Sequence, residues 1–240
     1  MIRTVQCLLA ALLIVASFDA VAASFGLSPM RVDLSVAAPT AVITVNNSGD
    51  KAVTIQGQAF TWTQPQGKDT YEETRAFIIS PPIFTLPPGA KQIVRVALRG
   101  SAPSKEEQAF RLVFREVPQA EEAAVEGPIF RISLGMNIPM YVAPIGGAAV
   151  PRPNFGLETI PNAAPRLRIA NDGNSNLRLA NLTVMQEDDK LAELDVFVVL
   201  AGTMAFVNLP IDRVAPGRAL RVQAQSNVGP VDVAVPFPTH

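Results

Sequence analysis

Residues 129–141 read IFRISLGMNIPMY, and apolar and polar side chains alternate along most of this stretch. Because residues two apart in a β-strand point to the same face, the pattern predicts a strand with one apolar face. A strand that packs against its own sandwich fits this pattern, and so does an exposed edge that joins another protein's sheet. Periodicity alone does not separate these two interpretations. The apolar positions are Phe130, Ile132, Leu134, Met136 and Ile138, and the positions between them are Arg131, Ser133, Gly135 and Asn137.

The rest of the chain predicts many short strands separated by turns. Segments rich in β-branched and aromatic residues include 41–46 (AVITVN), 91–98 (KQIVRVAL) and 109–116 (AFRLVFRE). Turn signals made of Pro, Gly, Asn and Asp recur about every 8–12 residues, which is typical of a β-sandwich. No long segment has a convincing helical period. We therefore expect an all-β fold.

A stretch rich in Gly, Ala and Pro at 144–153 (PIGGAAVPRP) is the strongest domain boundary in the sequence. Strand-like segments such as 177–185 (LRLANLTVM) follow it. The sequence therefore predicts a first domain over 24–144, a linker over 145–153 and a second domain over 154–240.

The first 23 residues have the pattern of a secretory signal peptide. Arg3 gives a positive start, residues 8–16 (LLAALLIVA) form an apolar run too short to span a bilayer, and small residues at 20–23 suit cleavage. The single cysteine, Cys7, lies in this segment, so a chain cleaved near residue 24 has no thiol and no disulfide. We expect an exported protein with no membrane insertion after cleavage, and a retained membrane anchor is the alternative.

Residues that could do catalytic chemistry are scarce. The one histidine is His240, at the end of the sequence, which leaves no basis for a Ser-His triad or for imidazole metal ligands. Adjacent carboxylates at 121–122 and 187–189 are typical of solvated surface, and a paired-carboxylate hydrolase is the enzymatic alternative. The net charge of −1 gives no field that attracts nucleic acid. We therefore expect a binding function, without enzymatic activity, cofactor, metal or nucleic acid.

Several motifs, taken in order, resemble the periplasmic pilus-assembly chaperones of the chaperone–usher pathway, the PapD-like family. Separate motifs in the family's order are more specific than any single one. The resemblance is strong over residues 25–144 and weaker over 150–240. The motifs are SPMRVDL at 28–34, SPPIFTLPPGAKQIVRV at 80–96, FRLVFREVP at 110–118, and the alternating strand that ends at Tyr141 and Pro144.

This resemblance implies two immunoglobulin-like sandwiches joined at an angle, with a binding cleft between them. It implies a periplasmic chaperone that binds pilus subunits and delivers them to an outer-membrane usher. In the family, the last long strand of the first domain fills the groove of a subunit that lacks one strand of its own, which is strand addition. An immunoglobulin-like pilin or adhesin of the cell surface is the alternative. Matched position by position, the lent side chains are Phe130, Ile132, Leu134 and Met136.

The resemblance also implies a cationic anchor for the C-terminal carboxylate of the subunit. Arg31, in the first motif, matches the arginine of that anchor, and a guanidinium can hold a carboxylate through two hydrogen bonds. The family's second cation, a lysine on the lent strand, falls at Pro139, which carries no charge. Either Arg31 acts alone or another cation, Arg95 or Arg115, reaches the cleft. The ending of this strand is similar to the archaic subgroup, and self-association of the free chaperone stays open.

Overall fold

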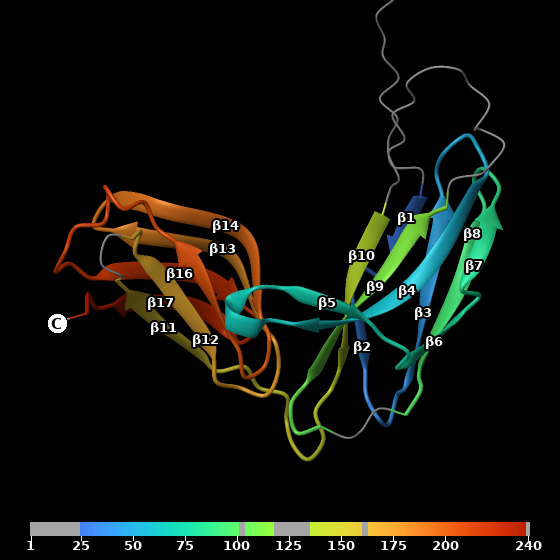
Figure 1. Ribbon diagram of the computed structural model, residues 1–240, viewed down its shortest axis with the longest axis horizontal. Coiled ribbons are helices and arrows are strands. Elements are labelled where there is room, and N and C mark those ends of the chain that lie inside the picture. Colours follow the sequence, from blue (N-terminus) through green and yellow to red (C-terminus); the bar gives the residue numbers. More distant parts are fainter. Residues whose placement is uncertain (1–24, 101–103, 118–134, 160–162, 239–240) are drawn as a thin grey trace, which may run out of the picture.

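The computed structural model describes residues 25–100, 104–117, 135–159 and 163–238, which form strands, loops and one short 3₁₀ turn. Two β-sandwich domains lie at an angle and give an L-shaped molecule (Figure 1). This is the all-β, two-domain architecture that the resemblance implies. The expected signal peptide lies outside the described residues. Within them, no helix is long and apolar enough to cross a membrane.

The first domain packs a four-stranded sheet against a six-stranded sheet. Buried and exposed residues alternate along most of its strands, because one face of each strand lies on the core. The four-stranded sheet has the order β1 (Phe25–Ser28), β3 (Thr40–Asn47), β8 (Lys91–Leu98) and β6 (Phe77–Ser80). The six-stranded sheet has the order β2 (Val32–Leu34), β10 (Gly135–Val142), β9 (Gln108–Glu116), β4 (Val53–Thr63) and β5 (Thr70–Glu73), and β7 (Ile83–Leu86) also pairs with β4.

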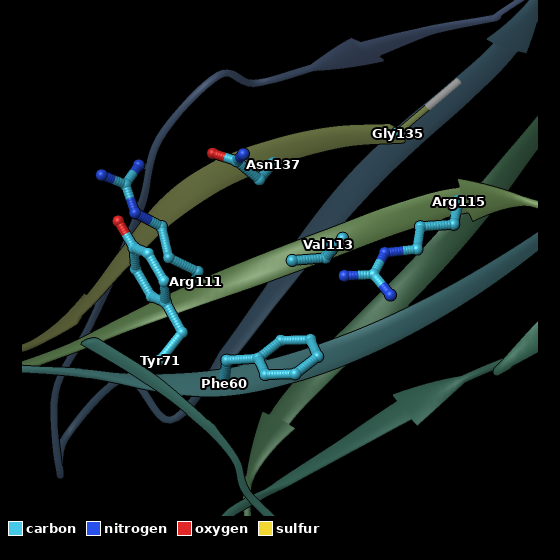
Figure 2. Close-up of a pocket in the computed structure, with 7 residues that line it drawn as sticks. All are labelled: Phe60, Tyr71, Arg111, Val113, Arg115, Gly135 and Asn137. Atoms are coloured by element: carbon cyan, nitrogen blue, oxygen red, sulfur yellow. The ribbon is translucent and has the colours of Figure 1, made fainter. Parts of the chain in front are cut away.

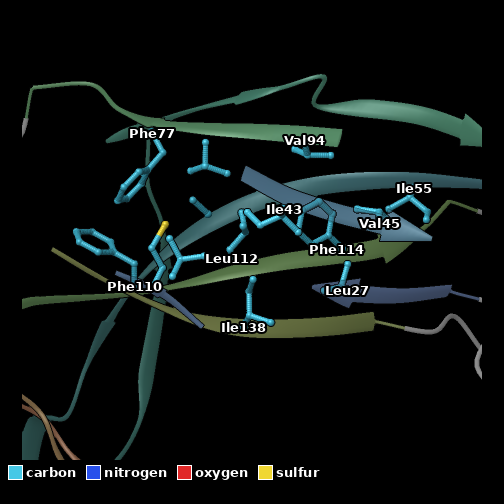
Figure 3. Close-up of a cluster of buried hydrophobic side chains, with 14 of the residues drawn as sticks. Leu27, Ile43, Val45, Ile55, Phe77, Val94, Phe110, Leu112, Phe114 and Ile138 are labelled. Atoms are coloured by element: carbon cyan, nitrogen blue, oxygen red, sulfur yellow. The ribbon is translucent and has the colours of Figure 1, made fainter. Parts of the chain in front are cut away.

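Side chains from both sheets fill the core of the first domain (Figure 3). Ile43 of β3 lies in one buried cluster with Leu112 of β9 and Ile138 of β10. The rings of Phe77 and Phe110 pack edge to face with their centroids 4.8 Å apart, which joins β6 to β9 across the sandwich. Each fully buried side chain of this size contributes about 1.5–3 kcal/mol, so the core holds both sheets in place.

The second domain packs a three-stranded sheet against a four-stranded sheet around a separate apolar core. The three-stranded sheet has the order β11 (Pro153–Glu158), β12 (Arg166–Asn171) and β15 (Met204–Asn208). The four-stranded sheet has the order β14 (Asp189–Val199), β13 (Leu177–Gln186), β16 (Leu220–Ser226) and β17 (Gly229–Val235).

One buried amide, Asn171, holds the start of the second domain together. Its Nδ2 donates to the backbone oxygens of Ser175, Val199 and Leu200 at 2.7, 3.1 and 3.1 Å. Its Oδ1 accepts the N–H of Arg152 at 3.0 Å, in the segment that enters the domain. Because a buried amide is costly to leave unpaired, this network fixes the turn after β12.

The junction between the two domains is built around the side chain of Gln64, which directly follows β4 and is 7% exposed. Its Nε2 donates to Asp69 Oδ1 and to the backbone oxygen of Val198, each at 2.9 Å. Its Oε1 accepts the N–H of Leu200 at 2.8 Å and the hydroxyl of Thr203 at 3.0 Å. A single side chain of the first domain therefore bonds three residues of the second.

Apolar and charged contacts reinforce this junction. Trp62 and Tyr141 of the first domain form a buried cluster with Leu200 of the second. Nearby, Glu107 Oε1 accepts hydrogen bonds from the N–H and the Nδ2 of Asn176, at 2.9 and 2.7 Å. Together these contacts set the angle between the sandwiches.

Candidate functional site

β10 has a complete ladder on one edge and a partial one on the other. β9 pairs with it from Gly135 to Val142, whereas β2 pairs with it, in parallel, only over Met140–Val142. Within the described residues, no strand pairs with the β2-side edge of β10 between Gly135 and Pro139. We call this stretch the free edge. An unpaired edge is a template on which another strand can add.

The backbone groups on the free edge follow from the alternation of the strand. The N–H of Ala143 donates to the backbone oxygen of Leu34, on the β2 side, at 2.8 Å. Because residues two apart direct their N–H and C=O groups to the same edge, Pro139, Asn137 and Gly135 point theirs to the free edge. Pro139 has no N–H, so Asn137 and Gly135 supply the donors.

The apolar face of β10 turns toward the core of its own domain. Ile138 and Met140 have no exposed surface, and Met136 is partly buried against the same core. Met136 therefore lies at the margin of this core. The other three residues predicted to be lent, Phe130, Ile132 and Leu134, lie outside the described residues.

The opposite face of the six-stranded sheet carries a shallow cavity of about 470 Å³ beside the free edge (Figure 2). Its wall is basic and aromatic, and its lining includes no carboxylate. The guanidinium of Arg111 lies 3.9 Å from the ring centroid of Trp62, and its Nε is buried without a hydrogen-bond partner among the described residues. The cavity is lined by Phe60, Tyr71, Arg111, Val113, Arg115, Gly135 and Asn137.

Arg31 lies at the end of the free edge, directly before β2 begins. Its guanidinium is paired with Asp33, with Nη2 2.7 Å and Nε 2.9 Å from Oδ1, and it lies 4.5 Å from the ring centroid of Tyr141. Burial raises the pKa of Tyr141 to about 12, and the positive charges of Arg31 and Arg111 oppose this rise. Tyr141 therefore contacts Arg31, feels the charge of Arg111, and lies in the apolar cluster at the domain junction.

The structure places the two candidates for the second cation, Arg95 and Arg115, on different sheets. Arg115 lines the cavity on the face next to the free edge, whereas Arg95 is exposed on β8, in the other sheet. Arg111, which the sequence analysis did not select, is the direct cross-strand partner of Pro139. A positive charge therefore lies one strand away from the position where the family has its lysine.

The sequence predicts one part of the position of Arg111, namely the face of the strand on which it lies. It lies between the buried residues Phe110 and Leu112, so alternation alone places it on the outer face of its strand. Its position beside Pro139 depends on how β9 pairs with β10, and the sequence does not specify that register.

Comparison with known families identifies the class of protein. The sequence model described as pili and flagellar-assembly chaperone, PapD N-terminal domain, matches residues 24–148. The chain belongs to this family of pilus-assembly chaperones. A chaperone of this kind is not a pilin, so the alternative of a structural pilin or adhesin is not supported, and the role of the family is non-enzymatic.

Solved structures share the fold at low sequence identity. The complex of the chaperone CsuC with the tip adhesion subunit CsuE, from archaic Csu pili of Acinetobacter baumannii, matches with a TM-score of 0.69 and 18% identity, over 90% of this chain and 100% of the matched chain. The YadV chaperone matches with a TM-score of 0.65 and 14% identity, over 90% and 100%. The SafB chaperone in complex with the SafA pilin of Salmonella enterica matches with a TM-score of 0.62 and 16% identity, over 88% and 96%. No curated protein sequence matches the chain.

Proposed function

We propose that this chaperone works in the periplasm, where it completes unfinished pilus subunits by lending them a strand and then passes them to an outer-membrane usher. The observation that best supports this proposal is the free edge of β10, with Arg31 at its end and Arg111 beside it. A subunit that lacks one strand exposes an apolar groove and two open sheet edges, which invite aggregation. Strand addition covers both, because backbone hydrogen bonds give affinity and alternate side chains give specificity.

The lent side chains in this proposal are Phe130, Ile132, Leu134 and Met136. Fully burying one such side chain contributes about 1.5–3 kcal/mol, so four contribute about 6–12 kcal/mol before the costs of association. Met136 lies at the margin of the chaperone's own core, where the lent part of the strand would begin.

Arg31 and Arg111 together are proposed to hold the C-terminal carboxylate of the subunit. A guanidinium has five N–H donors, so Arg31 keeps donors for a second carboxylate while it is paired with Asp33. Arg111 suits this role because it lines the cavity beside the free edge and is the direct cross-strand partner of Pro139. This assignment replaces the lysine that the family has at the position of Pro139.

The lending of the strand is tested by replacing Ile132 and Leu134 together with Glu. We expect this variant to lose capture of a co-expressed cognate subunit, because carboxylates would enter an apolar groove. The matched control replaces Val42 and Ile93 with Glu, since both are half exposed on the other sheet. Equal capture by the variant and the wild type, with both folded by circular dichroism, would refute strand lending.

The anchor is tested by replacing Arg31 or Arg111 with Ala. A charge-assisted hydrogen bond contributes about 1.5–3 kcal/mol, so each change should weaken subunit binding about tenfold to a hundredfold. Arg95→Ala is the control, because it removes an exposed arginine from the opposite sheet. If binding measured by calorimetry falls equally in all three variants, the loss is a matter of net charge and the anchor is elsewhere.

A further inference from the structure

Arg115 lies too far from Arg111 to take part in the carboxylate anchor. It lies on β9, four residues beyond Arg111, and is the direct cross-strand partner of Gly135. Residues in a strand rise about 3.3 Å each, so Arg115 lies about 13 Å along the sheet from Arg111. One subunit carboxylate at the base of the cleft therefore cannot engage both.

The guanidinium of Arg115 is exposed and carries no ion pair with any residue that the structure describes. Its guanidinium carbon lies 5.8 Å from the ring centroid of Phe60. The cavity next to Arg115 is also lined by Arg111 and Tyr71, and its lining includes no acidic side chain (Figure 2). The surface is therefore complementary to a negatively charged group.

Gly135 has no side chain that would stand between Arg115 and the free edge. A Cβ at Gly135 would lie 3.6 Å from Cγ of Arg115, so any larger side chain there would stand beside the arginine stem. Neighbouring strands lie about 4.8 Å apart, which places an added strand about 10 Å from β9. The long side chain of Arg115 and an acidic side chain on the added strand can together bridge that distance across the glycine.

The direction of the added strand follows from charge. Arg31 stands at the end of the free edge, where a carboxylate terminus is favoured and an ammonium terminus is repelled. A strand ending in a carboxylate there runs parallel to β10, as β2 does along the same edge. Directly opposed residues of paired strands share a face, so the residue opposite Gly135 points toward Arg115.

We propose that Arg115 reads an acidic side chain, Asp or Glu, at one fixed position within the last five residues of the bound subunit, and so selects which subunits are captured. This inference rests on the proposed function, because the C-terminal carboxylate sets the position of the added strand. The occupant is the final strand of a subunit, and its acidic group is distinct from the carboxylate held by Arg31 and Arg111.

The test uses the full chaperone and a library of random eight-residue tails with free C-termini, fused to a soluble carrier. Tails are selected on the wild type, on Arg115→Glu, and on Arg95→Glu, which makes the same charge change on the other sheet. An exposed ion pair of this kind changes affinity about two- to fivefold, which repeated selection amplifies. We expect Asp and Glu to be enriched at one of the last five positions with the wild type and Arg95→Glu, and to be replaced there by Lys or Arg with Arg115→Glu.

Two outcomes overturn the assignment of Arg115. One is an absence of acidic enrichment with the wild type, and the other is an enrichment that Arg115→Glu leaves unchanged. A parallel selection with amidated tails and with Arg31→Ala separates the two proposals. If tails bind only with a free carboxylate and with Arg31 present, yet show no acidic preference, the anchor stands and the Arg115 inference fails. If amidated tails bind equally well, or no free-carboxylate tail is selected, the anchor itself fails and the inference fails with it.

Discussion

Replacing Gln64 with Ala should loosen the angle between the two domains. The change removes the acceptor for the buried N–H of Leu200 and the donor to the backbone oxygen of Val198. Thr203 keeps a partner, because its hydroxyl also donates to the backbone oxygen of Leu200 at 3.0 Å. Two backbone groups thus lose their partners at about 1–3 kcal/mol each, so the junction should lose about 2–6 kcal/mol. At about 2–4 °C per kcal/mol for a cooperative unit of this size, that loss lowers Tm by about 4–24 °C.

Scanning calorimetry and small-angle X-ray scattering measure these effects directly. We expect Gln64→Ala to split a single unfolding transition into two, one for each sandwich, and to increase the radius of gyration. Gln223→Ala is the matched control, because the side chain of Gln223 bonds the exposed Asp232 within the second domain. One unshifted transition with unchanged scattering would refute the reasoning, since the domain angle would then not depend on this amide.

Three further predictions follow from burial. Ile138→Ala should lower the free energy of unfolding, measured in urea, by about 2–5 kcal/mol, because Ile138 is fully buried. The control, Ile93→Ala at an exposed position, should change it by less than about 0.5 kcal/mol. Equal losses in the two variants would contradict the packing. Burial raises the pKa of Glu107 above its ordinary value of 4.5, so its stability cost appears as the pH rises through that raised pKa. Glu107→Gln should therefore gain stability over the wild type at pH 7 and lose the advantage below pH 4.5; an advantage that grows in acid would oppose this reasoning. Burial raises the pKa of Tyr141 to about 12, so stability should fall as the pH rises from about 10 toward that value. Ultraviolet titration should then show a late phenolate phase that Tyr141→Phe removes. If the phase that Tyr141→Phe removes has its midpoint near pH 10, that burial is contradicted.

The strands that line the core were predictable from the sequence. The expected segments 91–98 and 109–116 correspond to β8 and β9, because their β-branched and aromatic residues alternate with polar ones. Four strands had no clear pattern in the sequence, and each of them pairs with a single neighbour: β5, β7, β11 and β15. Such a strand has one neighbour and little core to cover, so its sequence carries a weaker signal. β11 also begins with Pro153 and contains a glycine, which read as a turn in sequence.

The candidate site was predictable only in part, because its geometry depends on pairing between distant segments. Arg31 was selected through the family resemblance, and the structure places it at the end of the free edge. Arg111 was missed, because its contact with Pro139 depends on the register between β9 and β10. The alternation of 130–138 indicated one apolar face and left open whether that face covers the chaperone's own core or a partner. The structure places Met136 and Ile138 against the chaperone's own core.

Pro139 gives the free edge a definite stopping point. A strand that slid one residue along β10 would turn all of its side chains to the opposite face of the sheet. Movement toward β2 brings the incoming backbone against a residue that cannot donate a hydrogen bond, with Arg31 directly ahead. Pro139, which stands where the family has a charged residue, thereby makes misaligned pairing unfavourable. Correct alignment is then favoured by the backbone alone, whatever side chains the partner carries.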